Sequence, residues 1–216
     1  MAFGYKSNEA KIWANRVIEC LNGDADSVRS CSIKFNAQME ELVQPNVWTG
    51  SAAMKNFQNF MDVHQSLINF VNAFGNSFSE AMTEVAQGVA NLEVQNLGNS
   101  SVATTFGQLD FAQLTAMSET NINTTEDPYY DYNIIQSIGS ELKSIKGTLV
   151  IVKDKLISEI SLLNNADFWV GNAAERAKEE LLNVVNTNTE IIFKNLDICI
   201  NNISAAAEAA QMADQG

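Results

Sequence analysis

A short pattern that occurs twice constrains the fold of this chain more than any other feature. Trp48-Thr49-Gly50-Ser51-Ala52-Ala53 and Trp169-Val170-Gly171-Asn172-Ala173-Ala174 lie 121 residues apart, each between two long stretches of helical periodicity. The apolar residues upstream keep the same offset, so that one set corresponds to the other: Val28, Cys31, Phe35, Met39 and Leu42 to Leu149, Val152, Leu156, Ile160 and Leu163. The sequence therefore predicts a duplicated unit of helix, Trp-x-Gly turn and helix.

The composition indicates an all-α fold. Hydrophobic residues make up 46% of the 216 residues, which is enough to bury a core. Only 2 prolines and 11 glycines interrupt the chain. An all-β chain of this length would show a turn signal about every ten residues.

Four helices follow from the apolar periodicity. The first is expected to run from Ser7 or Asn8 to Gln44-Pro45, with a weak point at Gly23-Asp24 because glycine disfavours a helix interior. The second is expected to end at Gly98, the third to begin with Asp127 as N-cap before Pro128, and the fourth to begin near Ala173. The expected apolar stripes include these residues: Ile12, Trp13, Val17, Phe57, Phe60, His64, Phe74, Phe78, Ile138, Leu142, Leu181, Leu182, Val185, Ile191 and Ile192.

Two hairpins in one chain can bury each other. Residues 1–98 form the first expected hairpin, residues 99–127 a linker with a possible short helix, and residues 128–216 the second hairpin. The phenylalanines of the second helix line more than one seam, so an isolated hairpin would leave an apolar side in water. We therefore expect two long antiparallel hairpins packed as a four-helix bundle, a monomer in which fusion replaces dimerisation.

Charge and hydropathy exclude several classes of partner. The net charge of −13, without a basic cluster, argues against nucleic acid and against anionic membrane surfaces. The apolar runs are too short for a membrane span, and the first residues lack the apolar region of a cleavable signal peptide. A protein of this kind is expected to be made in the cytoplasm and, if exported, to use a route that reads no cleavable leader.

The residues that commonly carry catalysis form no recognisable arrangement. His64 is the only histidine and lies on an apolar stripe, so it is expected to be packed. Three cysteines in an odd count (Cys20, Cys31 and Cys199) are expected to be buried thiols. The acidic pairs Glu40-Glu41 and Glu179-Glu180 are typical of solvated helix faces, and Lys146-Gly147-Thr148 lacks phosphate-loop spacing. The sequence therefore predicts no enzyme, no metal site and no cofactor.

The two Trp-x-Gly turns between long helices, each followed by Ala-Ala, resemble the WXG proteins, or early-secreted-antigen family, of bacterial type VII secretion. The resemblance covers both repeats. It implies a four-helix bundle formed by two hairpins, here fused in tandem. Trp48, Gly50, Trp169 and Gly171 would then be the recognition residues: each glycine permits an unusual backbone, and each tryptophan can close the end of a hairpin.

The chain departs from the family at the export signal. Many members carry Tyr-x-x-x-Asp/Glu after the second helix, but residues 205–214 contain no tyrosine. Tyr5-x-x-x-Glu9 has the right letters at the other end of the chain, and Ala210-x-x-x-Asp214 has the spacing of a degenerate form. A partner that supplies the missing signal is therefore expected.

The expected function is that of a non-enzymatic substrate, adaptor or targeting module of a type VII secretion system. The expected partners are the export ATPase and a co-secreted effector, and the expected location is outside the cell or at its surface. Two alternatives remain: a membrane-active secreted protein of the virulence type, and the N-terminal targeting domain of a larger secreted toxin.

Overall fold

A computed structural model describes residues 4–5, 7–97, 129–165 and 169–214. Two short strands, β1 (Gly4–Tyr5) and β2 (Trp169–Val170), accompany five helices. The helices are α1 (Ser7–Asn22), α2 (Val28–Leu42), α3 (Ser51–Leu97), α4 (Tyr132–Ser161) and α5 (Asn172–Asp214). The described residues thus form the all-α bundle that the composition predicts.

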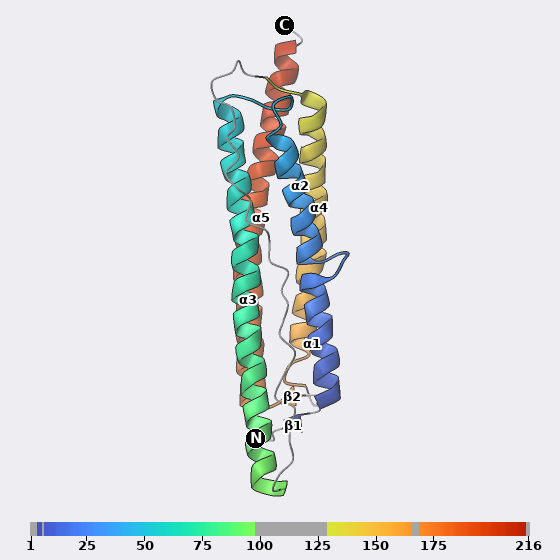
Figure 1. Cartoon of the computed structure of the whole chain (residues 1–216), viewed down its shortest axis with the longest axis vertical. Helices are drawn as coiled ribbons and strands as arrows, with labels where there is room; N and C mark the ends of the chain where they lie inside the picture. The colour runs from blue at the N-terminus through green and yellow to red at the C-terminus, as the bar shows by residue number, and fades with distance from the viewer. Residues whose placement is uncertain (1–3, 6, 98–128, 166–168, 215–216) are drawn as a thin grey trace.

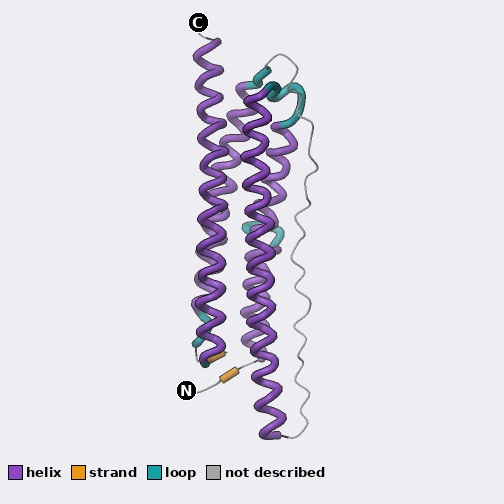
Figure 2. The backbone as a smooth tube through the Cα atoms, turned by 90° about the vertical axis from the view of Figure 1, so that its left-hand side faces the viewer, coloured by secondary structure: helices purple, strands orange, loops and turns teal. Residues whose placement is uncertain are grey.

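The helices lie side by side in four columns along the long axis of the molecule (Figure 1). α1 and α2 follow each other in one column, and α3, α4 and α5 each make another. Around the bundle, α3 packs on α5, α5 on α4, α4 on α1 and α2, and α2 on α3. α3, with 47 residues at about 1.5 Å each, is about 70 Å long, so the molecule is a slender rod (Figure 2).

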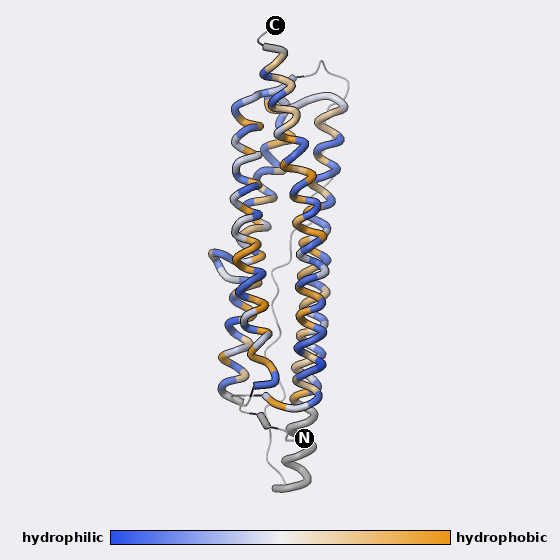
Figure 3. Tube along the Cα trace, turned by 180° about the vertical axis from the view of Figure 1, so that it is seen from behind, coloured by the Kyte–Doolittle hydropathy of each residue, from blue (hydrophilic) through white to orange (hydrophobic). Residues whose placement is uncertain are grey.

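The repeat predicts the core. All ten residues that correspond across the 121-residue offset are buried, with relative exposures of 5% or less. Aromatic rings extend this core along α3, where the ring of Phe78 lies 6.0 Å from that of Phe74 and 5.5 Å from that of Trp13 in α1. Phe35 and Phe60 stack at 5.2 Å between α2 and α3. Apolar and polar residues alternate along every column, as amphipathic helices require (Figure 3).

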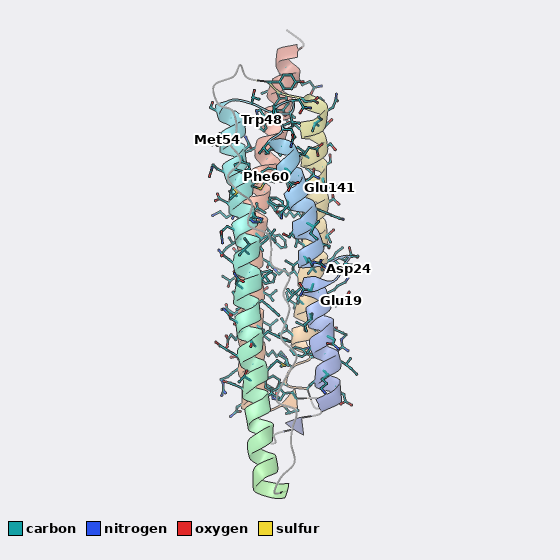
Figure 4. All side chains as sticks on the ribbon, in the orientation of Figure 1. Glu19, Asp24, Trp48, Met54, Phe60 and Glu141 are labelled. Atoms are coloured by element: carbon teal, nitrogen blue, oxygen red, sulfur yellow. The ribbon has the colours of Figure 1, made fainter. Side chains whose placement is uncertain are left out.

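The weak point expected at Gly23-Asp24 is a complete break between two helices. α1 ends at Asn22 and α2 begins at Val28, and the loop between them projects from the bundle at Asp24 (Figure 4). Asp26 adopts a positive φ of 47°, and Ser27 caps α2 by accepting a 3.0 Å hydrogen bond from the backbone N–H of Ser30. The chain therefore stops one helix and starts another rather than bending a continuous one.

Three local predictions are wrong. α4 begins at Tyr132 with Asp131 as its N-cap, whereas Asp127 and Pro128 lie outside the described residues. Of the adjacent leucines in α5, Leu181 is fully buried and Leu182 is only partly buried. Ile12 and Ile191 are exposed because they lie on the outer faces of α1 and α5. The expected linker 99–127 and the cap at Gly98 also fall outside the described residues.

Polar bonds tie the first hairpin to the second. The indole of Trp13 donates a 2.7 Å hydrogen bond to the carbonyl of Glu159, whose carboxylate forms an ion pair with Arg16 at 2.9 Å. On the other side, the amide of Asn195 donates to the hydroxyl of Ser66 at 2.8 Å. These bonds join α1 to α4 and α3 to α5, so they help to fix the axial register between the two hairpins.

Candidate functional site

The Trp48 turn lies at one end of the bundle and is paired with the segment that precedes α4 (Figure 4). Trp48 is 5% exposed and forms a β-bridge with Tyr130. The backbone N–H of Thr49 donates to the carbonyl of Tyr129 at 3.0 Å, and the N–H of Tyr129 donates to the hydroxyl of Thr49 at 2.9 Å. This reciprocal pair holds the first turn against the second hairpin.

Asp131 joins the same turn to the start of α4. Its backbone N–H donates to the carbonyl of Val47 at 2.8 Å. Its carboxylate accepts a 3.1 Å hydrogen bond from the N–H of Ile134, which satisfies one of the free donors in the first turn of α4. One residue therefore caps a helix of the second hairpin and binds the turn of the first.

The ring of Tyr130 packs edge-on against Trp48, with ring centroids 5.2 Å apart. Its hydroxyl is buried and has no hydrogen-bond partner in the described part of the chain. Burial, with a smaller contribution from Tyr132, raises the pKa of Tyr130 to about 12. The phenol is therefore neutral at physiological pH and acts as a packing group.

The Trp169 turn lies at the opposite end of the rod, where β1 pairs with β2 (Figure 1). The pairing is antiparallel, with Gly4 opposite Val170 and Tyr5 opposite Trp169. Trp169 is 1% exposed, and its indole N–H has no hydrogen-bond partner in the described part of the chain. The Tyr of Tyr5-x-x-x-Glu9 is thus brought beside the second tryptophan turn.

Asn164, which belongs to the second hairpin, stabilises the second turn through hydrogen bonds. It adopts a left-handed backbone with φ of 60°, and its side-chain oxygen accepts a 3.1 Å hydrogen bond from the N–H of Gly171. Its side-chain amide donates to the carboxylate of Glu175 in the first turn of α5. A further bridge pairs Asn165 with Trp169.

Gly50 and Gly171 have the same role at the two turns. Their φ angles are 92° and 132°, a region that side chains with a Cβ rarely adopt. Each glycine carbonyl accepts a hydrogen bond from the residue four positions on, Met54 at 3.3 Å and Glu175 at 3.1 Å. The glycines therefore allow the chain to reverse and begin α3 and α5 in one step.

The two turns do not form one site, since they lie at opposite ends of the rod. Each is instead paired with the segment that precedes the first helix of the other hairpin. Sequence reasoning singles out the tryptophans and glycines but misses Thr49, Tyr130, Asp131 and Asn164. Only Asp131 and Asn164 carry a local signal, because Asp favours N-caps and Asn tolerates left-handed backbone.

His64 and the cysteines are buried in the bundle. His64 is 2% exposed, and its Nδ1 lies 3.0 Å from the side-chain oxygen of Asn36. All three cysteines are free, and burial is the main cause that raises the pKa of Cys31 to about 11 and of Cys199 to about 12. Their thiols therefore stay protonated and unreactive at neutral pH.

A groove of about 680 Å³ between α4 and α5 is lined by Phe193 together with Lys153, Glu190 and Asp197, among others, without histidine, cysteine or serine. No group of three or more metal-ligating side chains occurs within residues 4–5, 7–97, 129–165 and 169–214. Over the same ranges, the helices lack an apolar stretch long enough to cross a membrane.

Comparisons of the chain with protein-family models, with curated proteins and with solved structures found no match. The function is therefore inferred from the two turns and the bundle that holds them.

Proposed function

We propose that this chain is a non-enzymatic substrate or adaptor of a type VII secretion system that acts through protein–protein contacts of its helical bundle. The observation that carries the proposal is the equivalence of the two Trp-x-Gly turns. Each has a buried tryptophan and a glycine with positive φ that starts the following helix. This equivalence supports the resemblance of both repeats to the WXG family.

The partner that we propose is the export ATPase, together with a co-secreted effector. The chain is proposed to act as a monomer, because each hairpin already covers the other's apolar face. Since both tryptophans are buried, a partner would contact the backbone of each turn and the residues around it rather than the indole rings. The position of Tyr5 opposite Trp169 also favours the proposal, because it brings the only Tyr-x-x-x-Glu of the N-terminal region to a tryptophan turn.

Secretion from the host that produces the chain tests the proposal. The Trp48→Ala/Trp169→Ala variant is expected to keep a helical spectrum and a cooperative melt, since most of the helix stability comes from the long apolar seam. It should remain inside the cell. Trp13→Ala is the matched control, because it removes an equally buried tryptophan that belongs to neither turn, and this variant should still be secreted.

Normal secretion of the folded double variant would refute the type VII assignment. Loss of secretion in Trp13→Ala as well would show that stability, and not the turns, limits export.

A further inference from the structure

The edge of the second turn that pairs with β1 is the feature that carries a further inference. We propose that β2 is a docking edge for an extended segment of a partner protein, with an aromatic residue opposite Trp169 and a small residue opposite Val170. In the structure, β1 occupies this edge in cis. The inference rests on the proposed function and deepens it, because it names the chemistry by which one turn would contact a partner.

The two tryptophan turns differ in how firmly they are covered. Residues 129–131 bind the first turn through three hydrogen bonds of 2.8 to 3.0 Å and continue directly into the capped start of α4. Within the described residues, β1 pairs with the second turn at two register positions. Exchange of the covering strand should therefore be far easier at the second turn.

The second turn keeps its shape without β1. The bonds that define it run from Asn164 to Gly171 and Glu175, and the bridge between Asn165 and Trp169 also lies within the second hairpin. Displacing β1 breaks none of these interactions. An edge that is already formed costs little reorganisation when a new strand binds.

The covering strand leaves one polar group of the site unused. The indole N–H of Trp169 is buried without a partner in the described residues, which is unfavourable for a strong donor. A segment longer than two residues brings further backbone carbonyls, which are suitable acceptors for an indole N–H. A longer strand can therefore satisfy a donor that β1 does not.

The register indicates which residues the segment needs. In strand addition, main-chain hydrogen bonds provide affinity and alternate side chains provide specificity. The residue opposite the tryptophan is a tyrosine at both turns, Tyr5 and Tyr130, and the second of these packs edge-on against its tryptophan. Gly4 lies opposite Val170. A small residue followed by an aromatic one is thus the class of ligand that fits.

Nuclear magnetic resonance of the labelled full chain provides the test, with a synthetic peptide of residues 2–7, Ala-Phe-Gly-Tyr-Lys-Ser, as the probe. Tyr5→Pro should weaken the cis strand, because proline lacks a main-chain N–H and its ring disfavours strand pairing. The peptide should then bind this variant about tenfold more tightly than the wild type, as expected when the fraction of open sites rises by that factor. The amide signals that shift should be those of Val170 and Gly171.

Matched variants separate strand pairing from other effects. Tyr5→Phe keeps the N–H and the ring, so it should bind the peptide as weakly as the wild type. A peptide with alanine in place of its tyrosine should not bind. Tyr5→Pro/Trp169→Ala should lose binding while circular dichroism shows native helicity, and Tyr5→Pro/Trp169→Leu repeats this test with a bulkier apolar side chain.

Three results would overturn the inference. The Tyr5→Pro variant could bind no more tightly than the wild type, or the shifted amides could cluster at the Trp48 turn. The wild-type chain could form a concentration-dependent dimer with shifts at Val170, which would make β1 of a second copy the occupant. These outcomes do not depend on secretion. Normal export of the double tryptophan variant would therefore refute the proposed function without refuting the inference about β2.

Discussion

His64 is the residue at which stability should respond to pH near neutrality. Burial lowers the pKa of His64, because the charged imidazolium would lose its hydration inside the bundle. Nδ1 can donate to Asn36, but Nε2 is buried without a partner in the described residues. Protonation there would place an uncompensated charge between α2 and α3.

The direction of this pH dependence follows from the linkage between protonation and folding. The unfolded chain binds the proton more readily than the folded chain, so the histidine's contribution to stability is complete above the unfolded pKa of about 6.5 and is lost as the pH falls below it. Urea unfolding at pH 7.5 and pH 5.5 should show a smaller free energy at the lower pH. His64→Gln should reduce this difference, and an equal difference in both proteins would assign the effect to carboxylates.

A pair of adjacent leucines tests the packing register of α5. Leu181 is fully buried, so Leu181→Ala should cost about 2–5 kcal/mol through lost burial and the cavity that remains. Leu182 is only partly buried against the core, so Leu182→Ala should cost clearly less. Denaturant midpoints measure both. Equal losses would contradict the register, because the two side chains differ only in the direction they face.

The same pair shows where residue-level prediction from sequence stops. Both leucines fit a helical stripe with spacings of three and four, and nothing local decides which one faces the core. The choice depends on how α5 is rotated against α3 and α4. The ten residues related by the offset were easier to predict, because two copies of one pattern restrict the rotation of both.

At the scale of elements, Ser27 should matter more than its small side chain suggests. Its hydroxyl accepts from the N–H of Ser30, the hydroxyl of Ser30 accepts from the N–H of Ser27, and the Ser27 hydroxyl also donates to the carbonyl of Gly23. Ser27→Ala should therefore destabilise the protein by about 0.5–2 kcal/mol, the usual effect of losing an N-cap. The Ser27→Thr variant keeps a hydroxyl at this position and should retain most of the stability in the same denaturation assay.

A Ser27→Ala variant as stable as the wild type would show that core packing alone places α2. The break itself was predictable, because Gly23 lies inside an otherwise apolar stripe. The start of α4 was not, since both Asp127 and Asp131 are good caps and Pro128 favours the first. A long-range hydrogen bond favours Asp131 as the cap: its backbone N–H also donates to the carbonyl of Val47, a contact that no local sequence pattern encodes.

At the scale of the whole molecule, the repeat predicts the bundle but not the way its ends are closed. The strand pairs that join one hairpin to the other are two residues long or shorter, which is too short to leave an alternating pattern, and they connect segments about 80 residues or more apart in sequence. They depend on which end of each hairpin meets the other. Tyr5 and Tyr130 therefore become visible as partners of the tryptophans only once the helices are assembled.

The assembled rod should behave as one unimolecular cooperative unit. Most of the long helix contacts join one hairpin to the other, because α5 packs on α3 and α4 packs on α1 and α2. Fusion keeps each hairpin at a high effective concentration for the other, about millimolar. The chain should therefore scatter light as a monomer of 23.7 kDa and unfold in a single transition whose midpoint does not depend on protein concentration.

Phe60→Ala and Leu181→Ala, one in each hairpin, test this unit together. Both side chains are fully buried, so each substitution should move the whole transition to a lower denaturant concentration without splitting it. Their effects should add approximately in the double variant if the two sites are independent. Two separate transitions, with each variant shifting only one, would mean that the hairpins fold independently and that the contacts between them contribute little to stability.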